Sequence, residues 1–445
     1  MNTQETPQAL EARLIDVYAR TKLSNAQHVF TQLLEEQAFA QVGKLSSAST
    51  SRLYGWMISL KDNIDVQGHT TMAGTTVCQG EPVAQADAPV VSRLRQAGAV
   101  LVGKTNMSEF AFSGVGINPH YGTPRNPRDA TLARIPGGSS SGAAVSVALG
   151  LAHAALGTDT GGSVRIPAAL CGLVGFKPTQ ARVPLQGVME LSRSLDTVGV
   201  IANNLQDCLD VEAVMAAHDF KAKPLPLQGL RFAVPQTLLL DDMEPAVARA
   251  FERSLSRLSA AGAEVVEITF AELSDIAPRS QPGGFSPVEG YAAHHVRLAR
   301  SQSNAQSLDP HVSARTIDHR VVARMALGKG VSAADYIALH DKRREWIGLA
   351  SAVLQGFDAM LCPTVPLIAP EIEPLLASDE AFFKANRLLL RNPAAINYLD
   401  GCSISLPCHM AGEFPVGLMV SCLGGQDAAL ASMALSMESA LRPSH

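Results

Sequence analysis

Hydrophobic and polar positions along this chain follow two different periods. From about residue 8 to 40, apolar residues recur every three or four positions, as at Leu10, Leu14 and Leu33, and this spacing predicts helices. Beyond residue 50, short continuous apolar runs alternate with helical patterns. The predicted strands cover residues 56–60, 99–102 and 154–157, and the predicted helices cover residues 90–97, 143–150 and 166–170. This alternation predicts an α/β layer with a largely parallel sheet.

Two glycine-rich turns interrupt the pattern, and each places a serine before a helix-like run. Residues 136–144 contain Gly-Gly-Ser ending at Ser139, and residues 156–167 contain Gly-Gly-Ser ending at Ser163. Glycine tolerates positive φ and lets the backbone approach a ligand closely. A Gly-Gly-Ser turn at a helix start therefore aims unpaired N–H groups and one hydroxyl at the same small volume. Acyl transfer needs this combination of a nucleophile and oxyanion donors.

A serine nucleophile also needs a base, and neither turn contains histidine, the usual one. Lys61 directly follows the apolar run 56–60, and burial there would lower its pKa from about 10.4 toward neutrality. The side chain of Asp62 would point to the other side of the extended segment, so it need not hold the lysine charged. Lys104 also follows an apolar strand, so burial alone does not choose between the two lysines.

These three stretches together resemble the amidase signature family, whose catalytic triad is Ser-cisSer-Lys. The resemblance runs from about residue 50 to 205, and it is weaker at residues 357–364 and 414–419. It implies that Ser163 is the nucleophile, that Ser139 is a bridging serine preceded by a cis peptide bond, and that Lys61 is the base. The match to the family's Lys-Asp-Asn pattern at residues 61–63 selects Lys61, and Lys104 is interpreted as structural.

The resemblance also implies roles for the residues around the triad. The backbone N–H groups expected to form the oxyanion hole are those of Thr160, Gly161, Gly162 and Ser163. Asp159 and Arg165 are expected to hold this turn in shape, and Ser140 and Ser141 to cap the helix beginning near Gly142. The residues expected to line the acyl-side pocket are Ala111, Phe112, Ser113 and Gly114. A flexible loop without a role in specificity is an equal alternative for these four residues.

For the fold, the resemblance implies one compact α/β domain over residues 1–445, with a mixed central β-sheet of about eleven strands flanked by helices. Within it we distinguish an N-terminal helical segment at 1–50, a signature core at about 50–205 and a more polar, variable helical region at about 270–345.

Composition narrows the class of protein further. The 445 residues are 47% apolar and 17% charged, which predicts a large buried core, and the net charge of −5 argues against a nucleic-acid partner. The longest weakly polar stretch, residues 143–157, is too short to span a membrane. The N-terminus has neither a basic start nor an apolar segment, so we expect a cytoplasmic protein.

We expect no metal and no cofactor. Seven cysteines form no C-x-x-C pair, which fits small buried side chains in a reducing compartment, and twelve histidines show no metal-ligand spacing. No lysine follows the glycines of the second turn as a phosphate-binding loop requires.

These observations favour a hydrolase that cleaves the C–N bond of a small or medium amide, anilide or carbamate through a seryl acyl-enzyme, with water as second substrate and ester cleavage as a side activity. The alternative is a glutamine-hydrolysing amidotransferase subunit. The usual A-R-Y-D-G-V-R stretch of that subunit is absent, because the corresponding region reads Gly290-Tyr291 followed by residues 294–298, His-His-Val-Arg-Leu. A homodimer is compatible with this interpretation, and the physiological substrate stays open.

Overall fold

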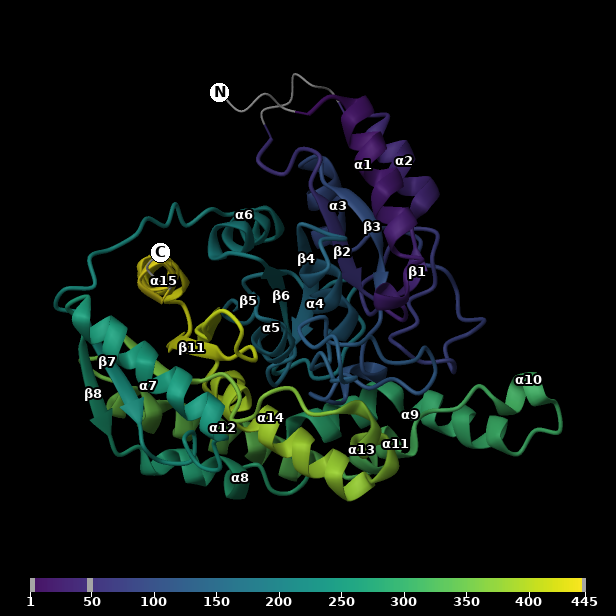
Figure 1. Ribbon diagram of the computed structural model, residues 1–445. Coiled ribbons are helices and arrows are strands. Elements are labelled where there is room, and N and C mark those ends of the chain that lie inside the picture. The colour runs from purple at the N-terminus through teal and green to yellow at the C-terminus, as the bar shows by residue number, and fades with distance from the viewer. Residues whose placement is uncertain (1–4, 46–50, 442–445) are drawn as a thin grey trace.

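Eleven strands form one continuous sheet through the middle of the computed structural model (Figure 1), which describes residues 5–45 and 51–441. Their order across the sheet is β1-β3-β2-β4-β6-β5-β10-β11-β9-β7-β8. The strands are β1 Phe30–Leu33, β2 Met57–Lys61, β3 Val100–Thr105, β4 Ala154–Asp159, β5 Val174–Lys177, β6 Thr197–Ala202, β7 Arg231–Pro235, β8 Glu264–Ile268, β9 Ala359–Pro363, β10 Cys402–Pro407 and β11 Gly417–Cys422. The expected single α/β domain with a mixed sheet of eleven strands is confirmed.

The sheet is not largely parallel, so that prediction from the alternation of elements is wrong. Within the described residues, β2 is parallel to β3 and β4, and β7 is parallel to β8 and β9. The other six strand pairs are antiparallel. The central antiparallel strands are covered by helices on both faces, and nearly all of their residues are buried, as those of parallel strands are. Hydrophobicity alone does not distinguish the two directions.

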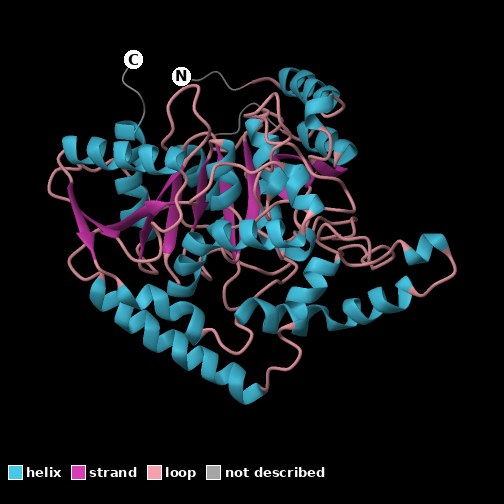
Figure 2. Ribbon diagram, turned by 60° about the horizontal axis from the view of Figure 1, so that its bottom comes forward, coloured by secondary structure: helices cyan, strands magenta, loops and turns pink. Residues whose placement is uncertain are grey.

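Helices cover both faces of the sheet (Figure 2). One core joins α3 (Pro89–Gln96), α6 (Leu205–Ala216), α7 (Pro245–Ala260) and α15 (Asp427–Leu441) to one face. On the opposite face, one core includes α1 (Pro7–Arg20), α2 (Glu35–Val42), α4 (Ser141–Ala148) and α5 (Arg165–Cys171), and another includes α12 (Ala333–Val353) and α14 (Asp379–Leu399). All seven cysteines are buried and form no disulfide.

The predicted N-terminal helical segment is interrupted by a strand. Residues 7–20 and 35–42 are helical, but Phe30–Leu33 forms β1, which pairs antiparallel with β3. Without β1, β3 would present a row of unpaired backbone groups at the edge of the sheet, and these groups hold the segment extended despite its helix-like spacing. Residues 1–4 and 46–50 of the predicted segment lie outside the described residues.

The variable region is helical, as its sequence indicated. It contains the helices α8 (Ile276–Arg279), α9 (Phe285–Ala305), α10 (Pro310–Ser313), α11 (His319–Ala326) and α12, and a 3₁₀ turn at Ala271–Asp275. The C-terminal end of α9 and α10 project from the body of the protein (Figures 1 and 2). The remaining helical elements are α13 (Ile372–Ala377) and 3₁₀ turns at Ser24–Ala26 and Glu109–Ala111. Over the described part of the chain, no helix combines the length and apolar character needed to cross a bilayer.

Candidate active site

Lys61 is the last residue of β2, and the strand's alternation decides which face it points to. Ile58 and Leu60 belong to the core on one face, whereas Met57 belongs to the core that includes α4. Side chains two residues apart share a face, so Lys61 points toward the α4 side, where Ser139 precedes that helix. The Lys61 Nζ atom is fully buried and lies 2.7 Å from Ser139 Oγ.

The turn that carries Ser139 packs tightly against a neighbouring loop. The Gly138–Ser139 peptide bond is cis, as the family resemblance implied. A Cβ atom on Gly138 would lie 2.6 Å from the backbone nitrogen of Gly116, so only glycine fits this approach. The N–H of Gly138 donates to the carbonyl of Gly114 at 2.8 Å, and the N–H of Ser108 donates to the carbonyl of Ser139 at 3.0 Å. The position of the Ser139 hydroxyl is therefore fixed by backbone contacts.

Ser163 lies in the second turn, between β4 and α5. The two turns touch, because the N–H of Ser140 donates to the carbonyl of Ser163 at 3.2 Å. Ser163 is 3% exposed and lines a cavity. Its hydroxyl has no hydrogen-bond partner among the residues that the structure describes. The structure thus joins Lys61 to Ser139 directly and places Ser163 on the adjoining turn, with its hydroxyl not bonded to Ser139.

The electrostatic surroundings of Lys61 favour a neutral amine near physiological pH. Burial lowers the pKa of Lys61 to about 7, although the carboxylates of Asp196 and Asp159 oppose this shift. Asp62 does not contact Lys61, because its Oδ1 atom lies 3.1 Å from Nζ of Lys104 in a fully buried ion pair. The expected structural role of Lys104 agrees with this geometry.

The expected set of oxyanion donors needs one correction. The N–H of Gly162 donates to Asp159 Oδ1 at 2.8 Å, so it is not available to a ligand. The N–H groups of Thr160, Gly161 and Ser163 donate to no acceptor within the described residues. Gly162 itself is required here, since its φ is +121° and an added Cβ would lie 2.5 Å from the side chain of Pro393.

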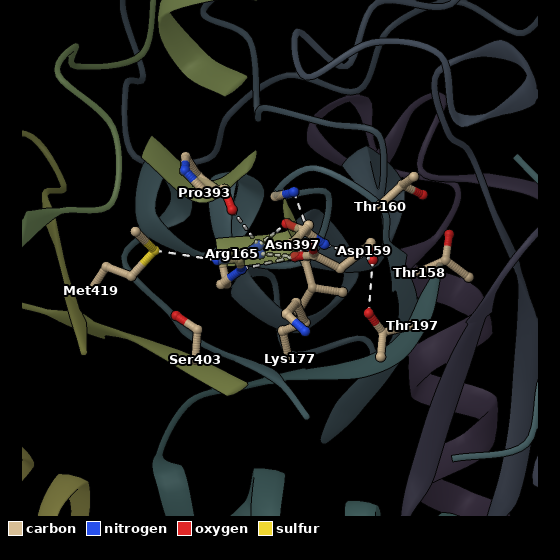
Figure 3. A network of polar contacts seen from close by, with 12 residues as sticks. Thr158, Asp159, Thr160, Arg165, Lys177, Thr197, Pro393, Asn397, Ser403 and Met419 are labelled. Atoms are coloured by element: carbon tan, nitrogen blue, oxygen red, sulfur yellow. Dashed lines mark hydrogen bonds and ion pairs between the residues drawn. The ribbon is translucent and has the colours of Figure 1, made fainter. Parts of the chain in front are cut away.

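A buried ion pair supports the second turn, and Figure 3 shows the network around it. Arg165 donates to Asp159 from Nε at 3.1 Å and from Nη2 at 2.9 Å. Asp159 also accepts the N–H groups of Gly162 and Val164. Burial alone would raise the pKa of Asp159, but the Arg165 guanidinium and other donors outweigh it and hold the pKa below its usual range. This geometry agrees with the expected role of Asp159 and Arg165 in shaping the turn.

Three polar residues of the site have no counterpart in the sequence prediction. Thr158 Oγ1 accepts a hydrogen bond from Lys61 Nζ at 2.8 Å. Asn397 in α14 accepts from Arg165 Nη2 at 2.5 Å and donates to Asp159 Oδ1 at 2.9 Å. Asp196 accepts from the hydroxyl of Thr160 at 2.5 Å. Asp196 directly precedes the apolar strand β6, and this position could have indicated a role for it. Nothing local in the sequence marks Asn397.

The two serines after Ser139 do not cap α4, so that prediction is wrong. Ser140 is at the N-cap position, but its hydroxyl donates to the carbonyl of Thr158 at 3.4 Å. The hydroxyl of Ser141 donates to the carbonyl of Asn106 at 3.2 Å. Both side chains are buried between the turn and neighbouring strands. The N–H of Gly142, which a capping side chain would accept, donates to the carbonyl of Asn106 at 2.9 Å instead.

A cavity of about 240 Å³ opens beside Ser163. Ala111, Phe112 and Ser113 line it, as expected, whereas Gly114 does not. Gly114 donates its N–H to Asn386 instead. The cavity is completed by residues that the sequence did not indicate, mostly from the variable region and α14: Leu191, Leu195, Ile276, Ser280, Gly284, Phe285, Ser286, Pro287, Arg324, Leu390, Ala394 and Tyr398.

Comparison with known proteins assigns a family to this arrangement of lysine, serines and glycine turns. Residues 10–431 match the sequence model of the Amidase family. The chain belongs to the amidase signature family. It is a hydrolase that acts on carbon–nitrogen bonds.

Individual relatives support this assignment over most of the amidase signature chain. The 2-amino-5-chloromuconic acid deaminase of Comamonas testosteroni is 35% identical over 402 residues, which are 88% of this chain and 83% of the relative. One subunit of the glutamyl-tRNA(Gln) amidotransferase of Koribacter versatilis is 30% identical over 444 residues, which are 93% of this chain and 91% of the relative. A crystal structure of an amidase superposes with a TM-score of 0.82 at 30% identity, covering 98% of this chain and 96% of the other.

Proposed function

We propose that this enzyme hydrolyses a small or medium amide, anilide or carbamate through an acyl-enzyme on Ser163, with Lys61 acting as the base through Ser139. The observation that carries the proposal is the direct contact of 2.7 Å between the buried Lys61 Nζ and Ser139 Oγ, beside a turn that presents Ser163 to a cavity.

A neutral amine can make the hydrogen bonds around Lys61. A neutral amine has two N–H donors and one lone pair, whereas an ammonium has three donors and no lone pair. Thr158 provides two acceptors for Nζ, its Oγ1 at 2.8 Å and its carbonyl at 3.4 Å. With both N–H groups directed to Thr158, the lone pair is free to accept the proton of Ser139.

The proposed reaction begins when Ser163 Oγ attacks the carbonyl carbon. The Ser163 proton passes to Ser139 as the Ser139 proton passes to Lys61. The negative charge on the former carbonyl oxygen faces the free N–H groups of Thr160, Gly161 and Ser163. Each donor of this kind typically contributes about 3 kcal/mol to the stability of the transition state.

The carbon–nitrogen bond then breaks, and the leaving nitrogen takes the proton from Lys61 by way of Ser139. This leaves an acyl ester on Ser163. Water then attacks the ester, and its proton passes through Ser139 to Lys61. The bond to Ser163 breaks, Ser163 regains a proton from Lys61 by way of Ser139, and the acid is released.

Glutamine hydrolysis for an amidotransferase is the second candidate, and it is favoured by the similarity to the Koribacter versatilis protein. The different sequence at residues 290–298 counts against it.

A substrate panel tests the choice between these functions. Release of the amine or ammonia is measured for glutamine, malonamide, an acyl anilide and an aryl carbamate, with wild-type protein and with Ser163→Ala. We expect turnover of at least one of the last three that Ser163→Ala abolishes. Turnover restricted to glutamine would favour the amidotransferase function, and equal turnover by the variant would refute the acyl-enzyme on Ser163.

A further inference from the structure

Glu289 is a buried carboxylate on α9 that uncharged donors hold in place of a counter-ion. Its side chain is 3% exposed, and it forms no ion pair with any of the described residues. Oε1 accepts the hydroxyls of Ser194 and Tyr336, the second at 2.5 Å. Oε2 accepts the hydroxyl of Ser192 and the N–H of Ser194, the second at 3.1 Å. Four donors match the acceptor sites of a carboxylate, which offsets the cost of burying its charge.

Three of the four donors belong to one loop, residues 191–196, which we call the wall loop. Leu191 and Leu195 of this loop line the cavity beside Ser163. The wall loop lies outside the helices and strands of the structure. Its conformation therefore depends on contacts such as those with Glu289.

The last residue of the wall loop holds the second glycine turn. Asp196 accepts the N–H groups of Leu191 at 2.9 Å and Ser192 at 3.0 Å, and its Oδ1 atom accepts the hydroxyl of Thr160 at 2.5 Å. Ser192 thus bonds to two carboxylates, through its N–H to Asp196 and through its hydroxyl to Glu289. A continuous path of hydrogen bonds joins α9 to the turn that carries the proposed oxyanion donors.

The helix α9 packs directly against the cavity wall at the next residue, Gly290. An added Cβ atom there would lie 2.6 Å from the ring of Phe112 and 3.4 Å from the carbonyl oxygen of Leu191. Phe112 and Leu191 both line the cavity. This close approach gives Glu289 a fixed base from which to hold the wall loop.

Arg343 of α12 holds the wall loop from another side. It donates to the carbonyl of Ser194 at 3.0 Å, and to the carbonyls of Asn397 and Tyr398, both at 2.9 Å. Without Glu289, Ser194 would keep this bond. The hydroxyl of Ser192, by contrast, has no second acceptor among the described residues. The contact with Ser192 is therefore the one through which Glu289 acts most on the loop.

We propose that Glu289 is a positioning residue of this hydrolase: it fixes the wall loop, and the wall loop in turn holds Thr160 for the oxyanion. The inference rests on the proposed function, in which Thr160 is an oxyanion donor. Glu289 does not line the cavity, so it acts through the loop and not on the substrate. Oxyanion donors act on the transition state more than on the bound substrate, so loss of Glu289 should lower kcat more than it raises KM.

Two variants that each remove one hydroxyl from Glu289 test the proposal. Ser192→Ala removes the contact with the wall loop, and Tyr336→Phe removes a matched contact with α12, outside the cavity. For the best amide of the substrate panel, we expect Ser192→Ala to lower kcat by about fivefold or more, and Tyr336→Phe to change it by less than about twofold. Equal effects of the two variants on kcat would overturn the proposal.

Substitution of Glu289 itself should give a larger effect. We expect Glu289→Ala to lower kcat by about tenfold or more, which is less than the 10²–10³-fold cost of deleting an oxyanion donor outright. Glu289→Gln should recover part of this loss, because its amide oxygen accepts two donors and hydroxyls can accept from its NH₂. If Glu289→Ala folds poorly, Ser192→Ala carries the test. A change confined to KM would overturn the proposal.

A double-mutant cycle separates positioning from general stability. Thr160→Val deletes the hydroxyl that Asp196 accepts, which interrupts the same path one step later. Glu289→Ala should therefore cost about threefold or less in kcat when it is added to Thr160→Val, against about tenfold in the wild type. Fully additive losses would mean that Glu289 supports the fold alone, and the proposal would be overturned.

Hydrogen exchange tests the same link without turnover. In Glu289→Ala we expect faster amide exchange in peptides covering residues 189–196 and 159–165, and in Tyr336→Phe no change in either. Faster exchange in the first peptide alone would break the link to the oxyanion turn and overturn the proposal. Faster exchange in both, in a protein that hydrolyses no amide of the panel, would support the link while contradicting the proposed function.

Discussion

Asp62 pairs with Lys104 at 3.1 Å and not with Lys61, its neighbour in the chain. Both lysines are fully buried, but only Lys104 has a carboxylate in contact. Lys61 instead contacts uncharged oxygens of Ser139 and Thr158. The two lysines therefore have different expected roles: Lys104 holds a buried charge, and Lys61 accepts a proton.

Substituting each lysine by methionine should separate these roles. Lys104→Met leaves Asp62 as an uncompensated buried acid, and we expect a loss of about 3–5 kcal/mol in the free energy of unfolding. Lys61→Met should lower kcat/KM for an amide by about 10³-fold or more with a much smaller effect on stability. Urea denaturation and initial rates measure both effects. A Lys61→Met protein that was as unstable as Lys104→Met, and retained its activity, would reverse the assignment.

The activity should increase as the pH rises through about 7. Lys61 accepts a proton only in its neutral form, and its pKa is lowered to about 7, so the charged form below that pH is inactive. Burial also raises the pKa of Asp196 to about 6, so the acidic limb must be assigned by mutation. In profiles of kcat/KM against pH, Asp196→Asn should keep the limb but move it to lower pH, because the Asp196 carboxylate raises the pKa of Lys61. Loss of the limb in Asp196→Asn would point to that carboxylate.

Comparing an amide with an ester tests the role of Lys61 in a second way. Lys61→Ala should lose the limb and nearly all amide hydrolysis. A matched ester with a good leaving group should lose less, because its departure needs less help from an acid.

The two serines should differ in covalent labelling. Ser163→Ala should abolish amide hydrolysis and also labelling by a fluorophosphonate, with far-ultraviolet circular dichroism unchanged. Ser139→Ala should slow turnover by about 10²–10⁴-fold, the usual contribution of positioned proton transfer, while Ser163 remains the labelled residue. Mass spectrometry of the labelled peptide identifies the site. A Ser139→Ala enzyme with a tenth of the wild-type activity would reduce Ser139 to a packing residue.

Asp196 should be needed for the shape of the second turn. It accepts the Thr160 hydroxyl and the N–H groups of Leu191 and Ser192, and Asp196→Ala leaves all three buried donors without an acceptor. We expect a loss of about 2–4 kcal/mol in unfolding free energy and at least a tenfold fall in kcat/KM. Asp196→Asn is the control, since its amide oxygen can accept the two N–H groups while its NH₂ donates to Thr160. Equal losses for both variants would show that the charge matters more than the hydrogen bonds.

Much of the site was predictable because its chemistry lies in short local patterns. Lys61 follows an apolar strand, and Ser139 and Ser163 end glycine turns, so strand burial and turn geometry could be inferred from neighbouring residues. The family resemblance supplied the mixed sheet and the cis bond before Ser139, which hydrophobic periodicity cannot give.

The unpredicted features depend on contacts between distant segments. Asn397 and Arg324 reach the site from helices in the second half of the chain, and no motif in their local sequence marks them as residues of the site. The strand β1 has helix-like spacing and is extended because β3 pairs with it. Gly162 was expected to offer its N–H to a ligand, but the carboxylate of Asp159 accepts it, which only the folded turn reveals.

Arg165 contacts residues that lie far downstream in the chain, and this has a consequence for biosynthesis. Its guanidinium bonds to the carbonyl of Pro393 at 3.1 Å, to Asn397 and to the sulfur of Met419. A nascent chain that has left the ribosome up to residue 390 already contains Lys61, Ser139 and Ser163, yet it lacks all three of these acceptors. The segment that shapes the hydrolytic turn is thus among the last to be translated, and an incomplete polypeptide carries the reactive residues without the frame that aligns them.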